Sequence, residues 1–200
     1  NMIRSYIHRC QKDGVKIVMN CEVTPELIKE EKPDSVIIAT GSKTLILPIE
    51  GIDNPAIIHG SDLLDGKRAA GKKVLVVGGG MVGCETAAFL GEQEHDVTVI
   101  EFRDTVGADV IHEHRVYLMK DFEDYGIKEI TGAKVCKFYE DGVEYETADG
   151  VRHESRGYDS VILSMGFRNY NPLEEKIKDL VPETHVIGDA IRARRALDAT

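Results

Sequence analysis

Hydrophobic residues along the chain fall alternately into short continuous runs and into helical spacing, a pattern typical of α/β proteins. The runs at residues 35–39 and 158–164 are apolar enough to predict fully buried parallel strands. Between them strands and helices alternate, in the order strand 73–77, helix 81–93, strand 96–101 and helix 109–125. The predicted fold class is therefore α/β.

The N-terminal residues carry clear local signals. Apolar residues at helical spacing predict a helix at 2–12, and a short strand is expected at Val15–Met19. Thr24 is a typical N-cap and Pro25 a typical first helical residue, which predicts a helix of about two turns ending at Lys32.

Irregular segments separate these elements from the rest of the chain. Residues 42–60 contain prolines and glycines and are interpreted as a crossover between two domains, after which Ser61 caps a short helix. A last strand is expected at 184–187, and Gly188-Asp189-Ala190 then opens the final helix.

The hydrophobic period changes to about two after Gly126. Three short runs follow, near 133–139, 142–147 and 151–155. Asp141-Gly142 and Asp149-Gly150 separate them, and Asp-Gly pairs are strong signals of β-hairpin turns. This part of the chain therefore predicts a β-meander.

A glycine-rich loop joins the strand at 73–77 to the helix at 81–93. Gly78-x-Gly80-x-x-Gly83 has the spacing of the dinucleotide-binding fingerprint. The glycines permit a tight turn, close approach of a pyrophosphate, and close packing of helix on strand. The helix N-terminus offers free N–H groups and partial positive charge to phosphates. The predicted binding residues are Gly78, Gly79, Gly80, Met81, Val82 and Gly83.

An acidic residue at the end of the next strand completes the fingerprint. Glu101 lies 23 residues after Gly78, close to the roughly 20 expected for the residue that binds the adenosine ribose. Its carboxylate would accept hydrogen bonds from the ribose hydroxyls and repel a 2′-phosphate, which predicts NADH over NADPH. Arg103 leaves the other possibility open, because its side chain can pair with that phosphate.

Charge and cysteine content narrow the function classes. The formal net charge is −10, which argues against nucleic acid or an anionic membrane surface as a partner. The four cysteines are far apart and form no C-x-x-C pair, so they predict neither disulfides nor a zinc site and fit a cytoplasmic protein. His112 and His114 point about 200° apart on a helix, so no metal site is expected there.

Three further turns at strand ends carry a resemblance to a family. The apolar run ending in Ala39-Thr40-Gly41, the Ser164-Met165-Gly166 turn and the run ending in Gly188-Asp189 follow one another in the order of the two-dinucleotide-domain flavoproteins. The chain resembles this family, the pyridine nucleotide-disulfide oxidoreductase superfamily, over nearly its whole length. The resemblance implies a Rossmann-like, three-layer NAD(P)-binding domain with a β-meander, inserted in a partial FAD-binding domain.

The resemblance also implies a division of the chain and roles for several residues. Residues 1–48 and 167–200 would belong to the FAD domain, and 49–166 to the NAD(P)H domain. Asp189 would bind the ribityl hydroxyls of FAD. Glu85 falls where the family places a carboxylate near the nicotinamide, although a first-turn acid favoured by the helix dipole explains it equally well.

The chain also departs from the family. The N-terminal FAD fingerprint, the interface domain and the redox-active cysteine pair are absent from these 200 residues, so we expect an excised part of a longer protein. The chain is most similar to the C-terminal part of Old Yellow Enzyme-like NADH:flavin oxidoreductases of the 2,4-dienoyl-CoA and 2-enoate reductase type. That resemblance implies an FMN barrel and an iron–sulfur cluster elsewhere in the parent.

The expected function is that of an NADH-binding electron-input module, which passes hydride from NADH to FAD for an acceptor on other domains. The cofactors carry that chemistry, so no catalytic acid or base is expected in this chain. The alternatives are a non-catalytic NAD(H)-binding or redox-sensing module and a stand-alone Rossmann dehydrogenase. The turns at Ala39-Thr40-Gly41 and Gly188-Asp189 argue against the dehydrogenase, which needs neither.

Overall fold

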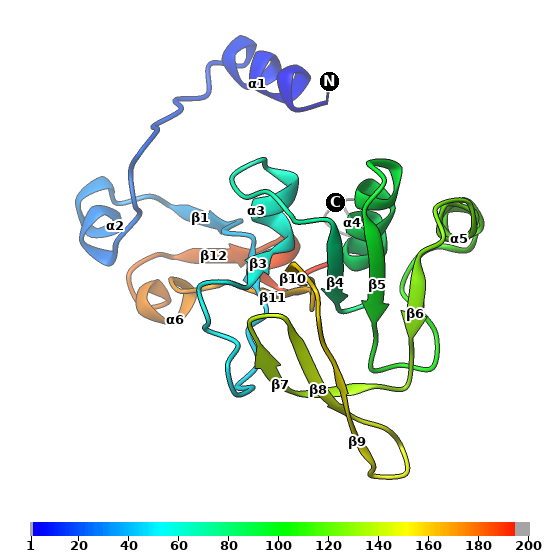
Figure 1. Cartoon of the computed structure of the whole chain (residues 1–200). Coiled ribbons are helices and arrows are strands. Elements are labelled where there is room, and N and C mark those ends of the chain that lie inside the picture. Colours follow the sequence, from blue (N-terminus) through cyan, green and yellow to red (C-terminus); the bar gives the residue numbers. More distant parts are fainter. Residues whose placement is uncertain (1, 195–200) are drawn as a thin grey trace. The chain divides into compact units, whose positions relative to one another are not determined.

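A computed structural model describes residues 2–194 (Figure 1). Its contacts divide the chain into two compact units. The central unit is Ser42–Arg168, and the flanking unit combines the segments on either side of it. No helix among residues 2–194 is long and apolar enough to cross a membrane.

The central unit is built on a parallel sheet of five strands (Figure 1). From one edge to the other these are β3 (Ile58–His59), β10 (Ser160–Leu163), β4 (Lys73–Val77), β5 (Asp96–Ile100) and β6 (Lys128–Ile130). The helices that follow the first strands along the chain are α3 (Gly60–Leu64), α4 (Met81–Glu92) and α5 (His112–Asp124). The predicted α/β fold with a parallel sheet is confirmed.

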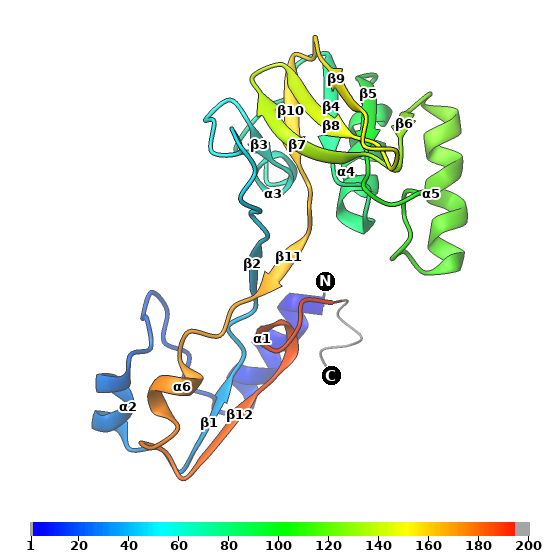
Figure 2. The same cartoon turned by 90° about the horizontal axis from the view of Figure 1, so that it is seen from below.

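Both faces of this sheet are buried, which gives the unit three layers. Val74 and Val76 of β4 pack among the buried residues of α4 and α5. Leu75 and Val77, which point to the opposite face because side chains alternate along a strand, pack against a β-meander. The meander consists of β7 (Lys134–Tyr139), β8 (Gly142–Glu146) and β9 (Arg152–Ser155), seen in Figure 2 beside the sheet. The predicted Rossmann-like, three-layer arrangement with its meander is therefore confirmed.

The flanking unit has a smaller sheet. Two parallel strands, β1 (Ser35–Ile38) and β12 (Glu183–Val186), pair along their whole length. The helices are α1 (Met2–Lys12), α2 (Pro25–Glu31), the short α6 (Glu174–Ile177) and a 3-10 turn, η1 (Gly188–Ala190). Its core is one small cluster of Ile28, Ile38, Leu173, Ile177 and Val181. Two short strands that pair with each other, β2 (Ser42–Thr44) and β11 (Phe167–Asn169), lie where the chain passes between the units.

The cap of α2 follows the sequence prediction. The Thr24 hydroxyl accepts a hydrogen bond from the Leu27 backbone N–H at 3.3 Å, and Pro25 is the first helical residue. The helix ends at Glu31, one residue before the predicted end, and its C-cap Lys32 adopts a left-handed conformation with φ 47° and donates its backbone N–H to the Ile28 carbonyl.

Of two strand predictions in the flanking unit, one was wrong and the other was wrong only about burial. Residues 15–19 form no strand, and Val15, Ile17, Val18 and Met19 are exposed. A run of apolar residues becomes a strand only when a neighbour accepts its backbone hydrogen bonds, and the described residues provide none there. The strand at 35–39 forms as β1 but is not fully buried: Ile37 is 65% exposed, because among residues 2–194 β1 has β12 as its single neighbour.

The predicted helix ends needed three corrections. Helix α3 begins at Gly60, so Ser61 is inside it, and its N-cap His59 makes no side-chain capping bond. Helix α5 begins at His112 rather than at residue 109: its N-cap Ile111 is extended, and Asp109 lies before it with its carboxylate on the Met81 N–H. Gly188–Ala190 forms only a 3-10 turn and residues 191–194 form no helix; residues 195–200 lie outside the described residues.

Candidate dinucleotide site

The glycine loop lies between β4 and α4, as the fingerprint predicts. Gly78 has a φ of +105°, a conformation that L-residues with a side chain rarely adopt. Gly83 packs so closely that a methyl group in place of its hydrogen would lie 1.8 Å from the Gly78 carbonyl oxygen. The first and third glycines therefore have the structural roles that the fingerprint assigns to them: the tight turn and close packing of helix on strand.

The middle of the loop is held by the segment that follows β5. A methyl group on Gly79 would meet the Cβ of Glu101 and a methyl of Val106, both at 2.9 Å. The Gly107 backbone N–H donates to the Gly79 carbonyl at 2.7 Å. This packing leaves the loop without room for side chains at its centre, as close approach of a ligand to the backbone requires.

Glu101 is oriented by two backbone N–H groups. One carboxylate oxygen accepts from Gly79 N at 2.6 Å, and the other accepts from Arg103 N at 2.9 Å. The two oxygens of a carboxylate have about four acceptor positions, so acceptor capacity remains for ribose hydroxyls. Glu101 is half-buried beside the loop, whereas Arg103 is exposed.

A second carboxylate that sequence reasoning missed lies on the same loop. Asp109 Oδ1 accepts the Met81 backbone N–H, the first of α4, at 3.0 Å. Its position in the chain, in the irregular segment before α5, gave no signal for this contact, because the contact depends on how that segment folds back. Met81 and Val82 are half-buried at the helix start.

Glu85 lies in the second turn of α4 with its side chain exposed. Its Oε1 is 3.8 Å from Nε2 of His114 on α5. The neighbouring His112 instead lines a cavity along α5, so the two histidines lie in different surroundings.

The turn after β10 lies against the first glycine. A methyl group on Gly78 would lie 2.5 Å from the Ser164 carbonyl oxygen and 3.1 Å from the Met165 Cα. Gly166, with a φ of +93°, ends the turn, and its carbonyl accepts the Leu45 N–H at 2.9 Å. The carboxyl ends of β4 and β10 thus meet at one edge of the sheet, where α/β folds bind ligands.

The remaining predicted residues lie together in the flanking unit. Ala39-Thr40-Gly41 and Gly188-Asp189 follow the carboxyl ends of the paired strands β1 and β12, and the Ile187 N–H donates to the Ile38 carbonyl at 2.9 Å. The Thr40 hydroxyl donates to the Tyr170 carbonyl. Asp189 is half-buried, and its Oδ1 accepts the Arg194 N–H at 3.2 Å. The two turns therefore form one edge, as a shared nucleotide site requires.

Cys84 lies directly under the glycine loop. Its side chain is fully buried, and its Sγ donates to the Gly79 carbonyl at 3.3 Å. Burial, which disfavours the charged thiolate, raises the pKa of this thiol to about 12. The thiol is therefore protonated at neutral pH and serves as a small packing residue.

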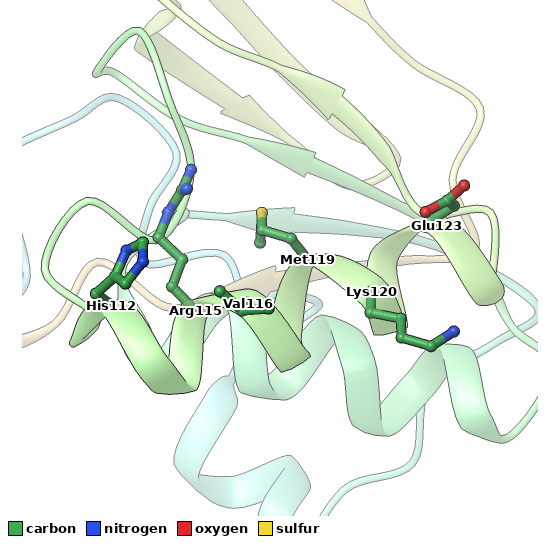
Figure 3. Close-up of a pocket in the computed structure, with 6 residues that line it drawn as sticks. All are labelled: His112, Arg115, Val116, Met119, Lys120 and Glu123. Carbon is green, nitrogen blue, oxygen red and sulfur yellow. The ribbon is translucent and has the colours of Figure 1, made fainter.

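A cavity of about 440 Å³ runs along one side of α5, separate from the glycine loop. Figure 3 shows its lining residues on this single helix, with Arg115 extending toward the loop after β5. The Arg115 guanidinium donates to the Val106 carbonyl at 3.1 Å and to the Thr105 hydroxyl at 2.8 Å. Arg115 therefore fixes the segment that holds Glu101 and Asp109.

Comparison with protein families gives a match to the pyridine nucleotide-disulphide oxidoreductase model over residues 7–185. Among characterised proteins, the chain is 30% identical to a cinnamate reductase of Clostridium sporogenes over 189 residues, which are 93% of this chain and 28% of the relative. It is 32% identical to an NADH oxidase of Thermoanaerobacter brockii over 191 residues, covering 93% of this chain and 29% of that protein.

A solved structure shows the same arrangement of elements. A 2-naphthoyl-CoA reductase in complex with 2-naphthoyl-CoA superposes with a TM-score of 0.87 at 32% identity. The match covers 99% of this chain and 30% of that chain. The chain thus spans less than a third of the length of these relatives.

Proposed function

Because this chain belongs to the pyridine nucleotide-disulphide oxidoreductase family, as its motifs predicted, we propose that it is the NADH-binding electron-input module of a flavin-dependent oxidoreductase. The single observation that carries the proposal is the glycine loop with Glu101 beside it. In this proposal hydride passes from NADH to FAD and serves an acceptor, an enoate or enoyl-CoA, on domains outside these residues.

The loop supports the dinucleotide part of the proposal. Its glycines put no side chains of their own at the start of α4, whose N–H groups and dipole favour a pyrophosphate. The Glu101 carboxylate, held by the N–H groups of Gly79 and Arg103, accepts hydrogen bonds from the adenosine ribose hydroxyls. The same negative charge disfavours a 2′-phosphate, and on this ground the proposal assigns NADH over NADPH.

The role proposed for Glu85 rests on the family resemblance. It orients the nicotinamide carboxamide, as the family resemblance implies, and His114 lies within 3.8 Å of its carboxylate. Gly166 contributes the turn that packs near Gly78, at the same sheet edge.

The flanking unit supports the flavin part of the proposal. Residues 1–48 and 167–200 are proposed as segments of an FAD-binding domain, and 49–166 as the NAD(P)H domain. The half-buried Asp189 offers a carboxylate oxygen to the ribityl hydroxyls, next to the turn at Ala39-Thr40-Gly41. When bound, the cofactors supply the hydride chemistry, and this chain binds and orients them.

The length of the relatives supports a role as one part of a larger enzyme. The cinnamate reductase and the 2-naphthoyl-CoA reductase are each more than three times as long as the matched region. We infer that an FMN barrel and an iron–sulfur cluster are the electron-transferring partners in the parent, and that these 200 residues alone do not complete the reaction. The four free cysteines fit a protein of the cytoplasm.

The test is an anaerobic titration of the full-length parent with NADH. The proposal predicts a yellow protein whose flavin absorbance bleaches with a stoichiometric amount of NADH. A colourless protein that binds NADH would instead indicate a non-catalytic NAD(H)-binding or redox-sensing module. A yellow protein that NADH leaves oxidised would contradict the proposal.

A further inference from the structure

Asp109 lies against the start of α4, where its carboxylate accepts the Met81 N–H. We propose that Asp109 is a built-in competitor of the dinucleotide, whose carboxylate must leave the Met81 N–H before a pyrophosphate binds there. This inference rests on the proposed function, because it concerns how strongly the same loop binds NADH.

The geometry sets up the competition directly. Asp109 Oδ1 accepts the Met81 N–H at 3.0 Å, and Oδ2 lies 3.1 Å from where a methyl group on Gly80 would be. Both carboxylate oxygens therefore lie over the start of α4. A pyrophosphate binds N–H groups at the same helix N-terminus and is negatively charged, as the Asp109 carboxylate is. The two anions therefore exclude each other.

Asp109 can leave while its backbone stays in place. The segment around it is pinned by the Gly107 N–H on the Gly79 carbonyl, by the fully buried Val106 and by the Arg115 guanidinium. The Asp109 side chain itself is exposed. Displacement therefore needs only a rotation of one exposed side chain, which is fast and leaves Glu101 and the glycines in position.

Asp109 also stabilises the protein when no nucleotide is bound. An acid at a helix N-terminus satisfies an N–H that has no partner within the helix, and it interacts favourably with the helix dipole. Asp109 thus stabilises the loop when no nucleotide is bound and lowers the affinity when one binds. Removing its charge while keeping an acceptor should separate these two effects.

The test compares calorimetric titrations of the purified chain and its variants with NADH and with ADP-ribose, which carries the same pyrophosphate. Asp109→Asn keeps a capping oxygen without the charge, and we expect both ligands to bind about 3- to 10-fold more tightly. Asp109→Ser, which removes the charge and shortens the side chain, should give a similar gain. The gain should shrink when the ionic strength rises, because salt screens the repulsion.

Glu113→Gln is the matched control, since it removes an equal charge from an exposed residue in the first turn of α5. It should leave both affinities unchanged. Unchanged or weaker binding by Asp109→Asn and Asp109→Ser, with normal binding by the unsubstituted chain, would overturn the inference alone. So would an equal gain in Glu113→Gln. Failure of every form to bind either ligand would overturn the proposed function together with the inference.

Discussion

The central and flanking units both contain parallel strands, yet the fraction of strand residues that is buried differs greatly between them. In the central unit, all four residues of β10 and four of the five residues of β4 are buried, with helices on one face and a meander on the other. In the flanking unit, β1 has one buried residue, α1 has none, and exposed apolar side chains include Met2, Ile3, Tyr6, Ile7 and Ile17.

This difference shows that the sequence predicts local turns better than it predicts burial. The glycine turns that follow β4, β1 and β12 lie at strand ends as their local motifs predict, although residues 15–19 form no strand. Burial did not follow the local pattern, because it depends on how many elements cover a strand. The central unit has enough elements among the described residues to cover both faces of its sheet, whereas the two strands of the flanking unit share one small core.

The largest expected effect is on hydrogen exchange. Amides of β4 lie in the middle of a fully covered sheet, whereas α1 has no buried residue. We expect β4 amides to exchange at least about 10³-fold more slowly than α1 amides in mass-spectrometric exchange experiments, because core elements open only with global unfolding. Comparable rates would mean that the two units do not differ in stability as their burial indicates.

A substitution at the third glycine should have the next largest effect. Gly83→Ala places a methyl group 1.8 Å from the Gly78 carbonyl, so helix and strand must separate. We expect a loss of about 3 kcal/mol in the unfolding free energy of the central unit, together with loss of NADH binding. Urea unfolding and NADH titration measure the two effects.

Gly150→Ala is the control for this substitution. Gly150 lies in the turn between β8 and β9 with a φ of +77° and open space around it, so only backbone strain of about 1 kcal/mol is expected. NADH binding should be unaffected. Equal costs at the two glycines would indicate that the close packing of α4 on β4 is not important.

The buried Cys84 thiol should make the unfolding free energy of the central unit depend on pH in the alkaline range. Its thiol pKa is raised to about 12 in the folded protein, so above about pH 9 the unfolded chain loses this proton first. The stability from this group is therefore complete below pH 9 and declines between 9 and 12, by at most about 1.4 kcal/mol per pH unit.

Cys84→Ala should remove that part of the slope, which urea unfolding of both forms at pH 8 and pH 10 measures. An identical slope in the two forms would show that burial does not hold the thiol protonated. Cys21→Ala, which removes a thiol at an exposed position, is the comparison variant.

The smallest effect concerns the flanking unit. Thr24→Ala removes the hydroxyl that accepts the Leu27 N–H at the start of α2, and we expect a cost of about 1 kcal/mol. Thr24→Ser, which keeps the hydroxyl, should cost little. Exchange of α2 amides should become faster while that of β4 amides does not, and a parallel change in β4 would show that the two units unfold together.

Much of the site could be predicted from the sequence because its chemistry is local. The strand, glycine loop and helix from residue 73 to residue 92 are contiguous, and Glu101 follows at the end of the next strand. Glycines are needed there for the left-handed φ of Gly78 and the close contact of Gly83, and spacing alone reveals these positions.

The features that sequence reasoning missed depend on contacts between distant residues. Strand β6 has only three residues and becomes a strand because β5 pairs with it. Asp109 was expected to begin a helix, but its carboxylate reaches Met81, 28 residues earlier. The run at 15–19 has the composition of a strand without a neighbour to pair with among the described residues. Composition and hydrophobic period do not reveal which distant residues contact one another.

The most direct test of the central claim is a calorimetric titration of this chain with NADH and with NADPH, repeated with Glu101→Gln. If the glycine loop and Glu101 hold the dinucleotide, NADH binds saturably and more tightly than NADPH. Loss of the Glu101 charge should reduce that preference by about tenfold or more, since a buried or half-buried charge interaction is worth over 1 kcal/mol. Tighter binding of NADPH by the unsubstituted chain, or no binding of either nucleotide, would contradict the account.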